Sequence, residues 1–392
     1  MNQWKYVKLG EVCTIERGGS PRPIDDFITT DENGINWIKI GDADESMYIT
    51  KTAQRIKPEG MKKSRYVKPG DFLLSNSMSF GRPYILKIDG CIHDGWLVLR
   101  DENNVFDKKF LYYYLSAPIT YKRFKSMAVG GVVNNLNSDM VRKVRVPIPS
   151  QEEQHQISDR LDKVSNLIFL RKQQIAKLDE LVKARFVEMF GDFEFNPKEF
   201  AVYHLCELCD VGSSKRIYQE EQSISGIPFL KVADLNELID TGKYSCSTFI
   251  PLERYEQLLH KELTPTENDI LITSRGTLGK CYIVQSDDEF YFQDGMISWL
   301  SNFSPKVSSI YISYLFAQPY IQKQIESLQA GSTVAYLSIA MLKKINVILP
   351  PKKLQDDFAT FVEHVDQQKQ TVRQSLEKLE LMKKALMQEY FG

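Results

Sequence analysis

Few residues of this 392-residue chain have the types and spacing that enzymatic chemistry requires. The segment Gly276–Lys280 resembles a phosphate-binding loop, but it is too short and is followed by Cys281 instead of Ser or Thr. Cys206 and Cys209 are two residues apart, but a zinc or redox site of this type needs a second pair, which the sequence lacks. The histidines show no ligand spacing. We therefore expect no catalytic residue, no metal site and no cofactor.

The residue types that remain are basic side chains near predicted strands, which can contact phosphates. Residues 51–68 carry seven Lys or Arg and one Glu, a difference of +6, although the net charge of the chain is −1. Arginine can also read guanine through two hydrogen bonds. An ordinary solvated surface is the alternative interpretation. The candidate residues are Lys62, Lys63 and Arg65 in the first half and Lys215, Arg216 and Arg275 in the second half.

The elements that would position these residues occur twice in the chain. Residues 110–191, moved forward by 201 positions, align without a gap on residues 311–392, and 21 of the 82 positions are identical. This period is too long for a solenoid repeat, so it indicates a duplicated domain. Earlier segments repeat more loosely, for example Asp94-Gly95 and Asp294-Gly295. A shared framework with divergent loops is typical of two copies that bind different targets.

The predicted fold class is α+β, because each half begins with short strands and continues into helices. Aromatic and β-branched runs such as Trp37–Ile40 and Trp96–Leu99 predict strands. One helix is predicted at Lys109–Ser126, and its repeat at Ser309–Leu328. A short helix and a strand should follow in each half. Glycine-rich loops are expected between these elements at Gly130–Asn135 and Gly331–Val334.

A long helix is predicted after Pro149 and again after Pro350. Apolar residues recur at alternating spacings of four and three, as in a coiled-coil seam. Forty helical residues would form a rod of about 60 Å. The seam positions are Ile157, Leu161, Val164, Ile168, Arg171, Ile175, Leu178, Val182, Arg185 and Met189, and then Phe358, Val362, Val365, Lys369, Val372, Leu376, Leu379, Lys383, Leu386 and Tyr390.

An apolar stripe of this kind must be buried against a partner. The simplest partner for each helix is the other one, so we predict that the two helices pack as an antiparallel coiled coil. This arrangement would return the C-terminus to the first domain. The alternatives are that each helix packs on its own domain, or that it pairs with another molecule.

Four segments together resemble one protein family. They are Lys8–Val12, Ile38–Asp42, Asp269–Lys280 and the stretch Val146–Ile157 that leads into the first long helix. In this order, repeated over essentially the full length, they resemble the DNA specificity subunits of Type I restriction-modification systems. One departure is Phe358, which stands where the family usually has an aliphatic residue.

The resemblance implies two target-recognition domains that alternate with the two helices. Residues 1–149 and 192–350 would each read one half of a split DNA site through base edges in the major groove. Residues 150–191 and 351–392 would form the helices that fix the gap between the half-sites. The six basic residues named above then become candidate DNA-binding residues.

The resemblance also implies a subunit without catalytic activity or cofactor of its own. Its partners would be double-stranded DNA, two DNA adenine methyltransferase subunits, and ATP-driven endonuclease/translocase subunits. The chain has no apolar run near the ~20 residues of a membrane span, and Met1–Lys5 does not begin a signal peptide. With six cysteines and no secretion signal, we expect reduced thiols, a cytoplasmic location and no membrane partner.

Two other functions remain open from the sequence. One is the specificity subunit of a related bifunctional Type II system, which would have the same architecture and a different partner. The other is a coiled-coil adaptor that does not bind DNA. Sequence-selective DNA binding in the presence of a methyltransferase distinguishes the adaptor from both specificity subunits.

Overall fold

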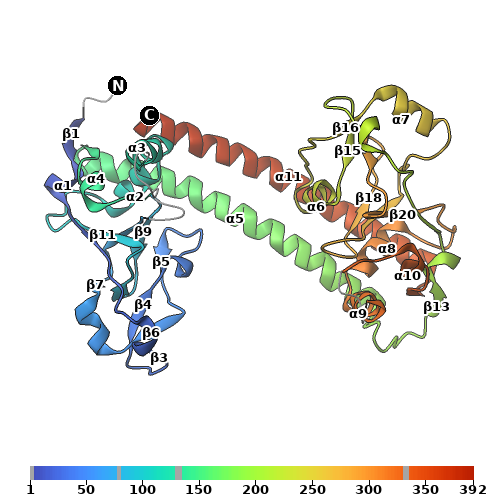
Figure 1. The fold of residues 1–392 in the computed structure, drawn as a ribbon, viewed down its shortest axis with the longest axis horizontal. Coiled ribbons are helices and arrows are strands. Elements are labelled where there is room, and N and C mark those ends of the chain that lie inside the picture. The colour runs from blue at the N-terminus through green and yellow to red at the C-terminus, as the bar shows by residue number, and fades with distance from the viewer. Residues whose placement is uncertain (1–3, 77–80, 129–134, 330–334) are drawn as a thin grey trace. The chain divides into compact units, whose positions relative to one another are not determined.

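A computed structural model describes residues 4–76, 81–128, 135–329 and 335–392. The chain forms two compact units, which we call unit 1 (Met1–Gln173 with Arg373–Gly392) and unit 2 (Gln174–Val372). Each unit contains strands, short helices and parts of both long helices (Figure 1). The glycine loops expected at 130–134 and 331–334 lie outside the described residues.

Unit 1 has two five-stranded sheets, ordered β2-β11-β8-β9-β5 and β3-β6-β4-β10-β7, and a β1-β12 ribbon. Side chains of β11 alternate between two cores, because successive residues of a strand point to opposite faces. Leu97 and Leu99 pack in one core, and Trp96 and Val98 pack in the other. The strands are β1 Lys5–Lys8, β2 Thr14–Arg17, β3 Ile28–Thr29, β4 Ile35–Ile38, β5 Tyr48–Ile49, β6 Gln54–Ile56, β7 Arg65–Val67, β8 Phe72–Ser75, β9 Pro83–Leu86, β10 Gly90–Ile92, β11 Trp96–Arg100 and β12 Arg145–Ile148.

Unit 2 repeats the central sheet with the order β14-β20-β17-β18, and adds a β16-β15-β19 sheet and a β13-β21 ribbon. It differs where α6 (Val232–Thr241) and α7 (Leu252–Leu259) stand in place of short 3-10 turns of unit 1. The framework is therefore shared and the insertions differ. The strands are β13 Ala201–His204, β14 Asp210–Ser213, β15 Ile227–Leu230, β16 Phe249–Ile250, β17 Ile270–Thr273, β18 Cys281–Ile283, β19 Tyr291–Phe292, β20 Ile297–Ser301 and β21 Asn346–Leu349.

The single helix predicted before each glycine loop is wrong, because a proline divides it in both copies. Unit 1 has α2 (Lys108–Ser116) and α3 (Pro118–Ala128), and unit 2 has α8 (Ser309–Phe316) and α9 (Pro319–Leu328). Ala117, which precedes Pro118, is extended at φ −64° and ψ 140°. Proline disfavours the helical conformation of the preceding residue and lacks an N–H for the helix. The short helices predicted next are α4 (Ser138–Arg142) and α10 (Ile339–Lys343).

The two long helices are α5 (Gln151–Phe190) and α11 (Lys352–Phe391). Every predicted seam residue is buried or half-buried, which confirms the heptad spacing. Residue numbers rise along α5 as they fall along α11, so the pairing is antiparallel, as predicted. The contacts are Arg160 with Tyr390 and Arg171 with Ser375 in unit 1, and Asp179 with Lys369 and Arg185 with Phe361 in unit 2.

The last residues of the chain belong to the core of unit 1. The Phe391 ring lies 5.6 Å from that of Phe110 and 5.5 Å from that of Tyr114, between centroids. In unit 2, Phe190 makes the same type of contact with Tyr311, at 5.0 Å. The identical Phe-Gly endings of the two repeats therefore mark two equivalent sites where a helix end packs on a domain.

A buried glutamine fixes the start of each long helix. Gln154 accepts a hydrogen bond from the Asp107 amide (2.8 Å) and donates one to the Pro149 carbonyl (3.1 Å). Gln355 makes the same pair of bonds with Ser308 (2.9 Å) and Pro350 (2.7 Å). Both side chains are fully buried, and each amide is satisfied on both sides. Among the described residues, no helix is long and apolar enough to cross a bilayer.

Candidate nucleic-acid interface

In unit 2, a turn at the start of β20 collects the basic residues that the sequence singled out. Arg216 follows β14, and its Nε donates a hydrogen bond to Oδ2 of Asp294 (2.9 Å). Arg275 follows β17, and its guanidinium lies 3.8 Å from the sulfur of Met296. The main chain ties these loops together, because Ser274 N–H donates to the Met296 carbonyl (2.9 Å).

These exposed cations stand on a buried and hydrogen-bonded backbone. The Lys215 amide donates to the hydroxyl of Tyr291 (2.8 Å), and Ser214 Oγ donates to the Phe292 carbonyl (2.7 Å). Tyr291 is fully buried, and Ile217 anchors the far side of the loop in the core. A loop held in this way presents its charges without first having to be ordered, which lowers the entropic cost of binding.

Unit 1 has the same turn at Asp94-Gly95. Ser20 Oγ donates to Oδ1 of Asp94 (2.9 Å), and Arg17 Nε donates to the Asp94 carbonyl (3.1 Å). Arg22 lies 3.7 Å from Oδ2 of Asp94. Burial alone would raise the pKa of Asp94, but the hydrogen bond from Ser20, with main-chain and charge interactions, lowers it overall. A carboxylate therefore lies beside cations at the same edge of the sheet in both units.

A surface cavity of about 720 Å³ adjoins this turn of unit 1. Lys39, Trp37 and His93 are part of its lining, together with Arg22 and Asp94. Burial is the main reason why the pKa of His93 is lowered, so the ring is neutral at physiological pH. The cations of the lining are Arg22 and Lys39, and its carboxylates are Asp25 and Asp94.

The other three candidate residues lie on a separate segment of unit 1. Lys62 and Lys63 end the 3-10 turn Pro58–Lys63, and the Lys63 ammonium lies over the Phe27 ring, 5.1 Å from its centroid. Arg65 pairs with Glu16 at 3.3 Å, so a neighbouring carboxylate partly balances its charge. In the part of the chain that the structure describes, none of the three side chains is seen to contact Asp94.

Comparisons with known proteins explain why this arrangement occurs twice. The family model named Type I restriction modification DNA specificity domain matches residues 1–180 and again residues 197–381. The chain belongs to this family. The Type I specificity architecture is therefore the framework on which the loops of both units are placed.

Curated members of the family align over most of the chain. The MjaVIII specificity subunit of Methanocaldococcus jannaschii is 24% identical, with 98% of this chain and 91% of the relative covered. The EcoBI specificity subunit of Escherichia coli is 20% identical, with 93% and 79% covered. Low identity over nearly full length agrees with a shared framework and divergent loops.

Solved structures show that the fold is that of Type I specificity subunits. The S subunit from M. genitalium has a TM-score of 0.58 at 16% identity, with 100% of this chain and 97% of that chain covered. A chain from a study of type I restriction-modification complex assembly has a TM-score of 0.59 at 15% identity, with 100% and 98% covered.

The sequence did not single out Arg17, Arg22 and Lys39, which the structure places at the Asp94 turn or in the cavity beside it. The signal was available, because Ser20-x-Arg22 matches Ser214-x-Arg216 just as Asp94-Gly95 matches Asp294-Gly295. The basic segment at 51–68 has a higher density of charge than the residues of this match. Local charge density is a weak guide, because it does not show which cations share one edge of a sheet.

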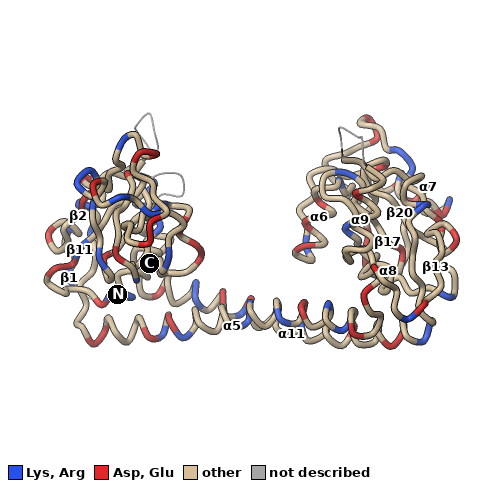
Figure 2. The backbone as a smooth tube through the Cα atoms, turned by 90° about the horizontal axis from the view of Figure 1, so that it is seen from below, with Lys and Arg blue, Asp and Glu red and all other residues tan. Residues whose placement is uncertain are grey.

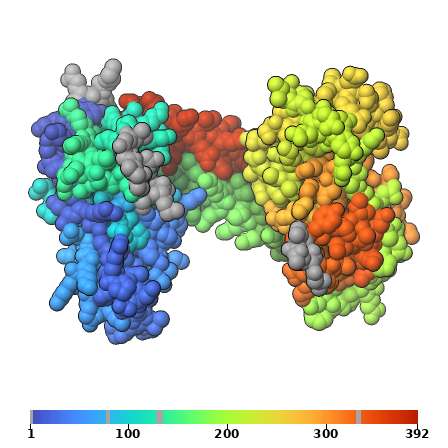
Figure 3. All heavy atoms as spheres, in the orientation of Figure 1, coloured from blue at the N-terminus to red at the C-terminus, as the bar shows by residue number. Residues whose placement is uncertain are grey.

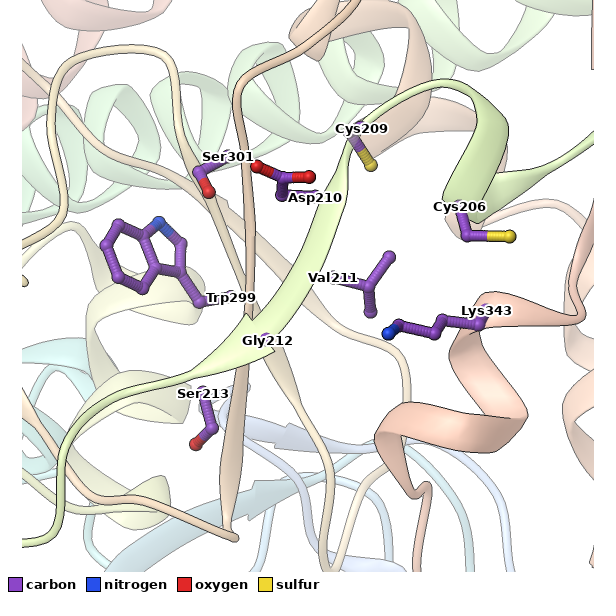
Figure 4. Close-up of a pocket in the computed structure, with 9 residues that line it drawn as sticks. All are labelled: Cys206, Cys209, Asp210, Val211, Gly212, Ser213, Trp299, Ser301 and Lys343. Carbon is purple, nitrogen blue, oxygen red and sulfur yellow. The ribbon is translucent and has the colours of Figure 1, made fainter.

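A second pocket, in unit 2, bears on the cysteine pair (Figure 4). It measures about 340 Å³ and is lined by Cys206, Cys209 and Val211, toward which Lys343 extends from α10. Both thiols are free, and burial raises the pKa of Cys209 to about 12, so this thiol stays protonated. Among the described residues, no group of three or more His, Cys, Asp or Glu is placed to hold a metal ion.

Proposed function

We propose that this chain is the sequence-specific DNA-recognition subunit of a Type I restriction-modification complex. The observation that carries the proposal is the repeated Asp-Gly turn, at which Arg22 in unit 1 and Arg216 in unit 2 pair with the aspartate of the turn at the same sheet edge. Each unit reads one half of a bipartite target, because the framework is common and the surrounding residues differ. The DNA-binding residues are Lys62, Lys63, Arg65, Lys215, Arg216 and Arg275, joined by Arg17, Arg22 and Lys39.

In this proposal, residues 1–149 and 192–350 are the target-recognition domains, and residues 150–191 and 351–392 set the spacer between the half-sites. The lengths of α5 and α11 and their seams support this division. Basic and acidic residues follow one another along the length of both helices (Figure 2). A helix pair of this kind keeps its length when loops on the domains change.

Catalysis belongs to partner subunits in this proposal. Two DNA adenine methyltransferase subunits dock on the helical region, and endonuclease/translocase subunits join them for cleavage in the cytoplasm. Exposed apolar residues of the helices support a docking role, because solvent-exposed leucines on a paired helix need another surface to cover them. Leu167 and Leu170 on α5 and Met382 on α11 are about half exposed in unit 1.

The test is a comparison of genomic methylation in a host with and without the gene, followed by a domain exchange. Replacing residues 192–350 by the matching segment of a family member should change one half of the methylated motif and leave the other half and the spacer unchanged. The adaptor alternative predicts no motif that depends on the gene. Changes in both half-sites would contradict the assignment of one domain to one half-site.

Two single substitutions distinguish a contact with the DNA phosphates from a contact with a base. We expect Lys63→Ala to weaken binding to all sequences and to reduce the salt dependence by about one unit of slope, because an ammonium group contacts phosphate as a point charge. We expect Arg275→Ala to relax recognition at one position of one half-site, at a cost of about 1–3 kcal/mol. DNA affinity of the methyltransferase complex against salt concentration is the measurement. If neither variant changes affinity, slope or motif, the binding surface lies on other loops.

A further inference from the structure

A surface groove of about 520 Å³ lies between β1, α3 and β12 of unit 1. β1, in dark blue, lies beside green residues of the β12 region on the face shown in Figure 3, and the two strands pair antiparallel. Every charged residue of the lining is basic. The lining consists of Tyr6, Arg123, Ser126, Met127, Lys143, Val144 and Arg145.

The charges of this groove are not neutralised by the protein. In the described ranges, no ion pair joins Arg123, Lys143 or Arg145 to a carboxylate, whereas the adjacent Arg142 pairs with Asp139 at 2.7 Å. The residues outside the description contain no Asp or Glu that could supply a partner. The groove therefore keeps three positive charges exposed to an incoming anion.

Two part-buried hydrogen bonds through Tyr114 and one exposed bond to Tyr6 position the two arginines. Arg123 NH1 donates to the hydroxyl of Tyr114 (2.9 Å), and this hydroxyl donates to the main-chain carbonyl of Arg145 (2.7 Å). Tyr114 is 2% exposed, and burial is the main reason why its pKa is raised, so the hydroxyl keeps its proton. The guanidinium of Arg145 bonds the Tyr6 carbonyl at 3.4 Å.

Unit 2 lacks the two arginines of this groove at the equivalent positions, although Lys143 has a counterpart in Lys344. Gln324 and Asn346 replace Arg123 and Arg145 at the offset of 201 residues, and Leu315 replaces Tyr114. The Gln324 amide bonds the main chain of Asn346 in both directions, at 3.1 and 2.8 Å. The basic groove is therefore a feature of unit 1 and not a product of the shared framework.

The groove is connected to the candidate interface of unit 1 through α3. The Phe124 ring of α3 packs directly on Gly81, where an added Cβ would come within 3.0 Å of it. Gly81 donates its N–H to the Ser75 carbonyl (2.7 Å), and the neighbouring Asn76 side chain donates to the Asp94 carbonyl (2.8 Å). The groove and the Asp94 turn thus belong to one packed part of unit 1.

We propose that this groove binds the sugar–phosphate backbone of DNA outside the bases that unit 1 reads. Two preformed guanidinium groups and an ammonium match the charge and the acceptor geometry of phosphate oxygens. The first half of the molecule then holds DNA through a sequence-independent, salt-sensitive contact that the second half lacks. This inference rests on the proposed DNA-recognition function.

The test is the double variant Arg123→Gln with Arg145→Asn, which gives unit 1 the residues of unit 2. Tyr114 retains its acceptor in the Arg145 carbonyl, so we expect an unchanged thermal unfolding midpoint. The affinity of the methyltransferase complex is measured between 50 and 200 mM NaCl for a target duplex and a random-sequence duplex. Loss of two phosphate contacts should reduce the slope of log affinity against log salt concentration by about 1.8 on both duplexes. Between the two salt concentrations, the variant should therefore lose about 12-fold less affinity than the unmodified complex. The methylated motif should stay the same.

Two controls decide what the groove binds. The double variant Arg123→Lys with Arg145→Lys keeps the charges and should retain most of the slope. The pair Lys261→Gln with Lys306→Gln removes two exposed charges of unit 2 and should leave the slope unchanged. The proposal is overturned if the Arg123→Gln/Arg145→Asn variant leaves the slope unchanged. It is also overturned if the Lys261→Gln/Lys306→Gln control reduces the slope by the same amount.

Two further outcomes also count against the groove as a DNA site. Weaker assembly with the methyltransferase, together with an unchanged slope for the complex that still forms, would assign the groove to an acidic segment of a protein partner instead. If the unmodified complex bound neither duplex, the proposed function itself would fall, and this inference would fall with it.

Discussion

Leu178→Asp is expected to abolish soluble, assembly-competent protein. Leu178 is a seam residue of α5, 9% exposed, in the core of unit 2 with Val182, Phe358 and Val362. Truncating a buried leucine to alanine costs about 2–5 kcal/mol, and a buried carboxylate without a partner adds to that. The nearest seam cation, Lys369, already pairs with Asp179 at 2.7 Å. A domain with a stability of roughly 5–15 kcal/mol does not tolerate the sum.

The matched control is Leu181→Asp, three residues further along the same helix. Leu181 is 48% exposed, so the same charge enters solvent and not the seam. Soluble yield, thermal unfolding and co-purification with the methyltransferase are the measurements, and the control should behave as the unmodified chain in the first two. A Leu178→Asp protein that is soluble and assembles with normal affinity would refute the seam assignment.

A four-residue insertion between Leu170 and Arg171 is expected to lengthen the spacer of the recognised motif without changing its half-sites. Four helical residues add about 6 Å, close to two base pairs at ~3.4 Å each. The seam is nearly preserved, because four is close to the 3.6-residue helical period. The measurement is the spacer in the methylated motif of a host that expresses the variant.

The antiparallel pairing adds a second arm to this experiment. α11 packs on α5 on both sides of the insertion point, through Tyr390 on Arg160 before it and through Ser375 on Arg171 after it. A matching insertion between Val372 and Arg373 lengthens both helices and should give a higher yield with the same longer spacer. An unchanged spacer in both variants would show that the helices do not set it.

The long helices could be predicted from the sequence because their packing follows a period. A seam repeats every seven residues, so twenty positions independently indicate the same buried face. Lys369 and Lys383 are compatible with this face because the aliphatic part of a lysine side chain can pack along the interface. The α2–α3 break was missed although Pro118 signalled it. The apolar pattern continues across the proline, since Phe110, Leu111 and Phe124 face the same core.

Only some of the residues of the candidate interface could be predicted from the sequence. Arg216 and Arg275 were found because strands flank them closely in the chain. Arg17 and Arg22 were not found, because they meet Asp94 only when β2 pairs with β11, and β11 lies some eighty residues away. Which strands become neighbours is decided by long-range packing, and no local pattern of charge contains that information.

Unit 1 is built from residues 1–173 and 373–392, so its two parts are synthesised at different times. Phe391 and Met387 fill the core of unit 1, whose other residues lie before residue 174. At ~5–20 residues per second, the ribosome delivers these last turns roughly 10 to 45 s after the rest of unit 1. All residues of unit 2 are therefore synthesised before the core of unit 1 is complete. A stop codon between codons 373 and 386 would then damage unit 1, although most of that unit is encoded before residue 174.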